Sequence, residues 1–380
     1  MIYLDNAATT PVRREAIEAM WPFLTGSFGN PSSVHSVGEI AARALRDARA
    51  EVARVTGCRP GDVIFTSGGT EADNLAVKGM TLATPRGRHI VTTPIEHEAV
   101  LESVAFLERV HGFEVTVLPV DAGGLVSAAD LAAAIRDDTT LVSIQYANNE
   151  VGTVQPIAEL AAVASARGIP FHTDAVQAAG WLPLGIDELG VDALSLAGHK
   201  VGAPKGIGAL IVRGRIPLEP VLHGGGQERE RRSGTENVAG AVAFATALRL
   251  AEAERADAAA GATERRDAFI AAVLASVPSA RLTGDATRRL PGTASFVFPG
   301  TSGEAVLLEL EQRDIISSSG SACAAGSEEA SHVLLALGLD AEVAQTAVRF
   351  TLASTTTADE LATAAAATAQ AVEAVSGIRG

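Results

Sequence analysis

The chain alternates between stretches with helical spacing and short apolar runs. Apolar positions recur with a helical period at 70–83, 97–111, 127–136 and 156–167. Seven runs of strand length lie among them, at 62–66, 89–93, 114–118, 140–145, 169–174, 192–197 and 208–212. This alternation is typical of a mostly parallel sheet with helices on both faces. We therefore predict an α/β fold with a seven-stranded sheet, in which functional residues follow the carboxyl ends of the strands.

The pattern changes after residue 212, which indicates a second structural unit. A Gly-rich, charged loop leads into one long helical stretch at about 235–277. From residue 281 the chain is typical of an α+β unit, with a strand at 293–298 and a helix at 303–312. We place the boundary inside the long helix, near Ala259. The prediction is a large domain of residues 15–259 and a smaller α+β domain made of 1–14 and 260–380.

Composition narrows the possible partners. Hydrophobic residues make up 47% of the chain and charged residues 20%, as expected of a folded globular protein. The balance of 30 Lys and Arg against 45 Asp and Glu gives a net charge of -15, which repels nucleic-acid phosphates and anionic lipid surfaces. Cys58 and Cys323 are the only cysteines, and the N-terminus has no signal-peptide pattern. We expect a cytoplasmic protein without direct contacts to nucleic acid or membrane.

Polar residues with chemical potential follow the first predicted strands. Gly69 and Thr70 precede a helix, where free backbone N–H groups suit an anion such as a phosphate; an ordinary helix cap is the alternative, and both can hold. His97 follows the second run and could lie flat over a ligand ring, although an isolated histidine is more often structural. After the fourth run, Asn148 is expected to face a ligand while Asn149 serves the turn.

Two later junctions point to a specific cofactor. Asp174 closes the fifth run, and a buried carboxylate needs a partner, such as the protonated pyridine nitrogen of pyridoxal 5'-phosphate (PLP), unless it is purely structural. Gln177 could reach a ring oxygen of the same ligand. Lys200 lies in a Gly-rich loop between two buried runs and is a candidate Schiff-base former; alone, a surface lysine would be the simpler interpretation. An anion cradle, a ring, an acid and an amine along one sheet together indicate a PLP site.

The C-terminal part contributes a thiol and a cation. Cys323 stands in the small-residue segment 317–327, which has little to bury and is expected to be mobile with an accessible thiol. Cys58, by contrast, is expected to be a small buried residue. Arg349 lies in an apolar strand-like run, and its guanidinium suits the carboxylate of an amino-acid substrate. The residues predict no metal site.

Taken together, these residues resemble the cysteine desulfurases of the NifS and IscS kind, which belong to the PLP-dependent class V aminotransferase superfamily with fold type I. The resemblance extends from Tyr3 to about Thr355. It rests on motifs that occur in the order of the family, at 3–11, 29–35, 148–150, 198–200, 232–235 and 318–323. The last motif is similar to that of the group with a long cysteine loop.

The resemblance implies a role for each candidate. Lys200 would anchor PLP and move protons, with Cys323 as the nucleophile and His97 stacked on the ring. The cofactor-binding set would be Gly69, Thr70, His97, Asn148, Asp174, Gln177, His199, Lys200 and, from the other subunit of a homodimer, Thr235. The substrate-binding set would be Asn30, Asn148 and Arg349, with Arg349 on the substrate carboxylate.

The implied reaction converts L-cysteine to L-alanine and leaves the sulfur on Cys323 as a persulfide. A sulfur-acceptor protein of unknown identity would then take it for iron–sulfur clusters, tRNA thiolation or another thio-cofactor. One alternative is a related PLP lyase or aminotransferase, which would not need Cys323; another is a non-catalytic relative, which would not need Lys200 and Asp174.

The sequence departs from the family pattern in two ways. Ala197 stands where the family usually has serine, which predicts weaker retention of PLP. The sequence also ends at Gly380, without the tail by which housekeeping members engage a scaffold, so the acceptor stays open.

Overall fold

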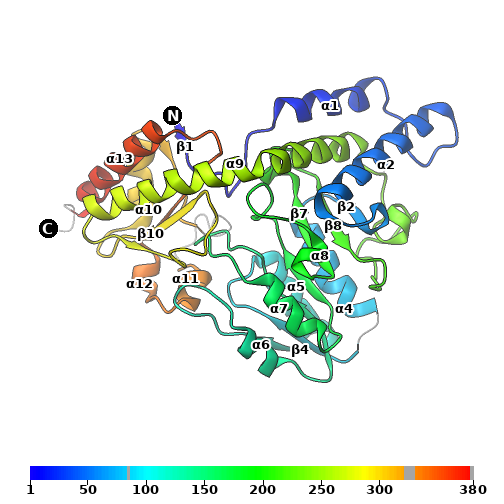
Figure 1. The fold of residues 1–380 in the computed structure, drawn as a ribbon, viewed down its shortest axis with the longest axis horizontal. Helices are drawn as coiled ribbons and strands as arrows, with labels where there is room; N and C mark the ends of the chain where they lie inside the picture. The colour runs from blue at the N-terminus through cyan, green and yellow to red at the C-terminus, as the bar shows by residue number, and fades with distance from the viewer. Residues whose placement is uncertain (84–85, 321–329, 377–380) are drawn as a thin grey trace.

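A seven-stranded sheet forms the centre of the computed structural model, which describes all residues except 84–85, 321–329 and 377–380 (Figure 1). The strand order is β2-β8-β7-β6-β5-β3-β4. Strands β7, β6, β5, β3 and β4 run parallel, whereas β8 is antiparallel to both of its neighbours. The bounds are Val63–Thr66 (β2), His89–Thr92 (β3), Glu114–Val117 (β4), Thr139–Ser143 (β5), Phe171–Asp174 (β6), Ala193–Ala197 (β7) and Gly208–Val212 (β8). The predicted mostly parallel α/β sheet of seven strands is confirmed.

Both faces of this sheet are buried, which explains the continuous apolar runs. Neighbouring residues such as Ile64 and Phe65, or Leu141 and Val142, belong to separate cores on the two sides of the sheet. The covering helices are α3 (Gly69–Asn74), α4 (Met80–Ala83), α5 (Glu98–His111), α6 (Ala128–Ala134), α7 (Ile157–Ser165) and α8 (Ile186–Leu189). The predicted helix at 70–83 contains a π-helical stretch, Leu75–Gly79, between α3 and α4.

Helix α9 (Val238–Ser276) connects the two parts of the molecule (Figure 1). Its first half packs with α1 (Arg14–Thr25) and α2 (Ser36–Thr56), and residues from Ala241 to Ala251 belong to the core of the large sheet. Its last turns, with Phe269 and Val273, belong to a second core beside α13. The predicted boundaries at 14/15 and 259/260 remain a prediction, and these two cores are compatible with them.

The second core covers a three-stranded antiparallel sheet of order β12-β10-β9. Phe269 packs edge-on against Phe296 and Phe350, with ring centroids 6.2 and 5.1 Å away. The N-terminal strand β1 pairs with β11, so the first residues pack with the C-terminal part, as expected. The elements of this part are β1 (Ile2–Tyr3), β9 (Arg281–Leu282), β10 (Thr293–Val297), α10 (Gly303–Glu311), β11 (Ile315–Ile316), α11 (His332–Ala336), α12 (Ala341–Ala344), β12 (Ala347–Thr351) and α13 (Ala358–Ser376).

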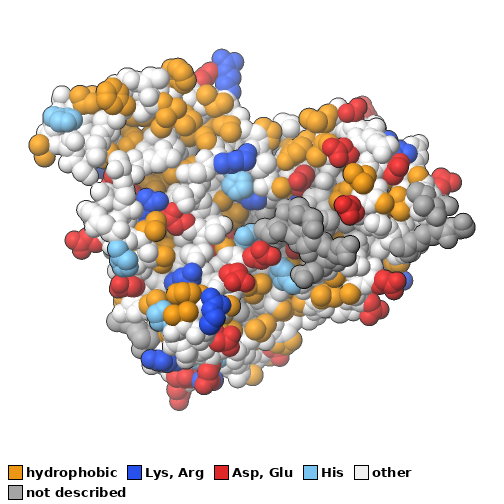
Figure 2. Space-filling model, turned by 180° about the vertical axis from the view of Figure 1, so that it is seen from behind, with side chains coloured by type: hydrophobic (Ala, Val, Ile, Leu, Met, Phe, Trp, Pro, Cys, Tyr) orange, Lys and Arg blue, Asp and Glu red, His pale blue; other side chains and the backbone are white. Residues whose placement is uncertain are grey.

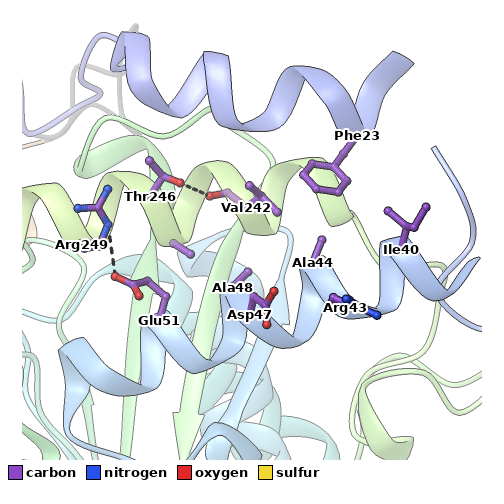
Figure 3. A pocket seen from close by; sticks show the side chains of 11 residues that line it. Phe23, Ile40, Arg43, Ala44, Asp47, Ala48, Glu51, Val242, Thr246 and Arg249 are labelled. Atoms are coloured by element: carbon purple, nitrogen blue, oxygen red, sulfur yellow. Dashed lines mark hydrogen bonds and ion pairs between the residues drawn. The ribbon is translucent and has the colours of Figure 1, made fainter. Parts of the chain in front are cut away.

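Apolar side chains gather on the lobe that carries α1 and the start of α2 (Figure 2). Large hydrophobic residues are exposed there at Ile17, Trp21, Leu24, Phe28, Val34, Val37 and Ile40, which we call the α1–α2 patch. Beside it, a groove of about 480 Å³ opens between α1, α2 and α9, with Phe23 on one side and the Arg249–Glu51 ion pair at one end (Figure 3). No helix within the described ranges is long and apolar enough to cross a membrane.

Candidate active site

A cavity of about 530 Å³ lies at the carboxyl ends of the central strands. The turns after β2, β3, β5, β6 and β7 contribute to its wall, together with the N-terminal segment at Ala7 and Ala8 and with β12. Carboxyl ends of parallel strands meet at one edge of a sheet, which is why residues so far apart in sequence converge. Eight predicted residues line this cavity: Gly69, Thr70, His97, Asp174, Gln177, His199, Lys200 and Arg349.

Asp174 ends β6 as a buried carboxyl at the wall of the cavity. Its Oδ1 accepts a hydrogen bond from the Val176 backbone N–H at 2.8 Å. Burial raises the pKa of Asp174, while the nearby charges of His97 and Lys200 act in the opposite direction. A cationic ring nitrogen would compensate this buried charge, so the residue fits the predicted partner of a pyridinium group.

Further buried acids line the same cavity, and the sequence interpretation gave none of them a role; Asp73 and Glu96 are the most deeply buried. Asp73 lies on α3 and Glu96 just before His97, each 1% exposed. Burial raises the pKa of Glu96 to about 8 and that of Asp73 well above its usual range. One oxygen of each, Asp73 Oδ1 and Glu96 Oε2, has no hydrogen-bond partner within the described part of the chain. Glu96 follows the end of β3 and Asp73 lies on the helix after β2, which was the available signal, but burial could not be inferred from it.

Lys200 lies in a tight turn that directly follows β7. Its Nζ donates hydrogen bonds to the carbonyl oxygens of Ala7 and Ala8, the latter at 2.9 Å. The turn is narrow, because a Cβ at Gly198 would lie 2.9 Å from the Ile207 side chain. The N-terminal segment therefore holds the lysine amine at the cavity wall.

His199 lies beside this lysine and is kept neutral. Its Nδ1 lies 3.2 Å from Thr9 Oγ1, and its carbonyl accepts from the Thr10 backbone at 2.9 Å. Burial, with the positive charges of Lys200 and Lys205, lowers the pKa of His199 to about 4. A neutral imidazole can still donate one hydrogen bond to an anion.

The start of α3 forms a cradle next to the Lys200 turn. A Cβ at Gly69 would lie 2.9 Å from Val176 Cγ2 and 3.3 Å from Ala197 Cβ, so this backbone can approach its neighbours only as glycine. Thr70 follows with its side chain at the cavity. Free N–H groups at a helix start suit a phosphate, and the fit of this cradle agrees with the PLP prediction.

Arg349 lies on β12 and is 1% exposed, yet it lines the cavity. Its Nη1 donates to the carbonyls of Asn149 at 2.8 Å and Gly320 at 3.0 Å, and its Nη2 lies 2.7 Å from Asp5 Oδ1. Its Nε has no partner among the residues the structure describes. The arginine that we predicted to bind a substrate carboxylate is thus held in place by the carboxylate of Asp5.

The structure reverses the predicted orientation of the two asparagines after β5. Asn148 is fully buried, its Nδ2 donates to the Ile95 carbonyl at 2.9 Å, and its Oδ1 accepts from the backbone N–H groups of Glu150 and Val151 at 2.8 Å. Asn149 instead lines the cavity. The prediction that Asn148 faces the ligand is wrong in this respect, because its amide is consumed by the turn and by the neighbouring β3 segment.

Asn30 and Thr235 are not among the described residues that line this cavity. Asn30 is exposed after α1, where its Oδ1 accepts from the Ser32 N–H at 2.9 Å. Thr235 is exposed in the loop before α9. Cys323 lies outside the described residues. In the described ranges, no group of three or more His, Cys, Asp or Glu side chains is placed to hold a metal ion.

Comparison with known proteins places these residues in a family. The model of the aminotransferase class-V family matches residues 2–363. The chain belongs to the class-V aminotransferase family. It is 47% identical over 361 residues to the cysteine desulfurase IscS of Dictyoglomus turgidum, covering 95% of this chain and 91% of that protein. It is 48% identical to an IscS-like cysteine desulfurase of Mycobacterium tuberculosis over 362 residues, covering 93% and 92%.

Solved structures agree with this assignment. A NifS-like protein superposes with a TM-score of 0.90 at 36% identity, covering 97% of this chain and 98% of the other. The protein SspA, solved in complex with cysteine, gives a TM-score of 0.81 at 38% identity, with coverages of 93% and 99%. The resemblance to NifS- and IscS-like proteins and the PLP fold type I are thereby confirmed. Membership of this family implies PLP as cofactor.

Proposed function

We propose that this protein is a cysteine desulfurase, which converts L-cysteine to L-alanine and takes the sulfur on Cys323 as a persulfide. The observation that carries the proposal is the convergence of Asp174 and Lys200 on one cavity at adjacent strand ends. The proposal is supported by the similarity to cysteine desulfurases, one of which is 47% identical over 95% of this chain. A role in iron–sulfur cluster assembly or thiolation is compatible with it.

The residues that would hold PLP form three groups around the cavity. Asp174 would meet the pyridine nitrogen and Gln177 the phenolic oxygen, with His97 against the ring face. Gly69, Thr70 and His199 would bind the phosphate at the start of α3. Bound there, PLP would supply an electron sink for the substrate Cα. Lys200 would anchor it covalently and, once released, carry protons between substrate atoms.

The substrate site would lie between Arg349 and Lys200. Arg349 would bind the substrate carboxylate, and Asn149, which lines the cavity, would take the place of Asn148 as the amide that faces it. Asn30, exposed in one subunit, would need a neighbouring chain to bring it to a site. The Cys323 thiolate would attack the substrate sulfur, since a thiolate is the reactive form of cysteine.

A homodimer would account for the exposed residues of the predicted site. The α1–α2 patch exposes large apolar side chains over one lobe, including Trp21 at 61% and Phe28 at 71%. A contiguous patch of this kind is typical of a protein interface. Thr235, exposed in its own chain, would then join the phosphate site of the other subunit.

The sulfur acceptor would be another protein, which must approach Cys323 from solvent. A cytoplasmic location fits the proposal, because a reducing compartment keeps a reactive thiol available. The strongly negative net charge of -15 argues against direct binding to tRNA, so thiolation would proceed through a carrier protein.

The test combines the visible spectrum of the purified protein with product analysis. Upon addition of L-cysteine with dithiothreitol, the PLP absorption band should shift, and alanine and sulfide should form in equal amounts, since the thiol reduces the Cys323 persulfide. Cys323→Ala should abolish sulfide release, whereas Cys58→Ser should preserve it, because Cys58 lies in a half-buried turn after α2, is not among the described residues that line the cavity, and has its thiol in hydrogen-bonding distance of Thr56 and Arg59.

Other outcomes would overturn the proposal. A PLP band without sulfide, or turnover that survives Cys323→Ala, would indicate a lyase or an aminotransferase. Absence of any PLP band, even after incubation with excess PLP, would indicate a non-catalytic relative.

A further inference from the structure

Asp5 is the carboxylate that holds Arg349, and it comes from the opposite end of the chain. Asp5 Oδ1 lies 2.7 Å from Arg349 Nη2, and the side chains are 18% and 2% exposed. Arg349 lines the cavity, whereas Asp5 is not among the described residues that do so. Asp5 therefore contacts the guanidinium from outside the cavity, where an incoming ligand does not displace it directly.

The position of Asp5 is fixed by its backbone. Asp5 forms a β-bridge with Thr351, two residues beyond Arg349 on the same strand. The Tyr3 hydroxyl donates to the Asp5 carbonyl at 3.0 Å, and Asn6 Nδ2 donates to the Thr351 carbonyl at 2.7 Å. Side chains anchored on both sides of Asp5 keep its carboxylate next to the arginine.

The contacts of Arg349 leave part of its guanidinium available. Within the described part of the chain, three of its five N–H donors are used, two on Nη1 by backbone carbonyls and one on Nη2 by Asp5. The Nε–H and one Nη2–H remain, and Nε has no partner in the described part of the chain. These donors on adjacent nitrogens can bind the carboxylate of a ligand. The positive charge of the guanidinium is then shared between that carboxylate and Asp5.

A second acid lies near Arg349. Glu150 is 4% exposed and lines the cavity beside Arg349. Its Oε2 accepts from the Ser331 hydroxyl at 2.5 Å. Burial raises the pKa of Glu150, and the positive charge of Arg349 counteracts this effect. Arg349 thus stands in an acidic surrounding, and the fixed Asp5 is its direct ion-pair partner.

We propose that Asp5 sets the strength with which Arg349 holds the carboxylate of substrate and product. The inference rests on the proposed role of Arg349 in amino-acid binding. Asp5 orients the guanidinium and neutralises part of its charge, so that L-cysteine binds firmly enough to react and L-alanine, with the same carboxylate, is released. Asp5 is a positioning residue that acts through Arg349 and determines affinity for the carboxylate.

The experiment compares Asp5→Asn with Asp137→Asn in the full-length, PLP-loaded protein. Asparagine keeps an oxygen acceptor for Arg349 and removes the negative charge. Asp137 is exposed before β5, at the end of the sheet opposite the cavity, and is the matched control for loss of one charge. The measured quantities are KM and kcat for L-cysteine and the inhibition constants of L-alanine and L-alaninamide, which lacks the carboxylate.

Asp5→Asn should lower KM for L-cysteine and the inhibition constant of L-alanine together, each by about tenfold, because one competing charge is gone. The inhibition constant of L-alaninamide should not change, and kcat should not rise. Asp137→Asn should behave as wild type. Asp5→Ser, which also removes the charge, provides the same comparison if the asparagine variant folds poorly.

Two results separate the possible failures. Arg349→Gln should weaken inhibition by L-alanine but not by L-alaninamide; equal inhibition of wild type and variant would remove the proposed role of Arg349 itself. If Arg349→Gln behaves as expected while Asp5→Asn and Asp5→Ser leave both constants unchanged or raise them, Asp5 is a structural anchor and the inference is wrong.

Discussion

His172 Nε2 lies 2.9 Å from Ser195 Oγ, which links β6 to β7 below the cavity. On the other side, His172 Nδ1 lies 2.9 Å from Ser143 Oγ on β5. The ring is fully buried, and burial lowers the pKa of His172 to about 3, so the imidazole is neutral. Asp174 is two residues further along β6 and faces the same side of the sheet. The histidine therefore braces three strands at the level where the acid of the site emerges.

Replacing His172 with alanine should destabilise the fold by about 3 kcal/mol. The substitution leaves a cavity and removes the partner of two buried serine hydroxyls. The free energy of unfolding in urea measures the loss. His111→Ala, at the half-exposed end of α5, is the matched control and should cost less than about 1 kcal/mol. Similar losses for both variants would show that the buried serine–histidine chain contributes little.

Glu96→Gln should change how stability depends on pH. The folded-state pKa of Glu96 is raised to about 8 by burial, so the folded protein retains a proton that the unfolded chain releases above its usual pKa of 4.5. The stabilisation from this proton is complete below about pH 4.5 and is lost as the pH rises through 8. Glutamine has no such proton to lose.

The variant should therefore match the wild type at pH 5 and exceed its unfolding free energy at pH 9, by on the order of 2 kcal/mol. Urea unfolding at both values, with protein freed of bound small molecules, provides the measurement. Glu108→Gln, exposed on α5, should leave the difference between the two pH values as in wild type. A Glu96→Gln protein that is no more stable than wild type at pH 9 would contradict the assignment of a protonated Glu96.

The buried pair between Arg49 and Glu228 should be far more sensitive than an exposed pair. Glu228 accepts two hydrogen bonds from Arg49 at 2.8 Å and one from the Phe65 backbone at 3.3 Å. Glu228→Gln leaves a buried guanidinium without its charge partner and should cost about 3 kcal/mol. Glu254→Gln should cost less than about 1 kcal/mol, because the Glu254 side chain is 51% exposed in its pair with Arg13. Equal unfolding free energies for the two variants would argue against this ranking.

Restoring a serine at position 197 should slow the loss of PLP by about tenfold. Ala197 Cβ lies close to the start of α3, so a hydroxyl there can donate to the cofactor phosphate, and such charge-assisted bonds are among the stronger ones. The rate of PLP release, followed by absorbance after transfer into cofactor-free buffer, measures the effect. Gly69→Ala should act in the opposite direction, because its Cβ would crowd Val176. Unchanged release from the Ala197→Ser protein would refute this explanation.

The sheet and much of the site were predictable because they depend on local patterns. Each apolar run became a strand within one or two residues of its predicted bounds, since strands buried on both faces require consecutive apolar side chains. The alternation of strands and helices also predicted that Asp174 and Lys200 would meet at one edge. The types of these residues and their positions directly after predicted strands were sufficient for that inference.

Only the tertiary structure decided which partner each polar side chain has. Asn148 turns away from the cavity because the carbonyl of Ile95, in the turn after β3, accepts a hydrogen bond from its amide. Burial raises the pKa of Asp73 and Glu96 because α3 and the turn after β3 are packed beneath other elements, which no local pattern records. Asp5 reaches Arg349 across 344 residues of sequence. Local spacing determines the elements and their order, whereas burial and the pairing of charges arise when distant segments pack together.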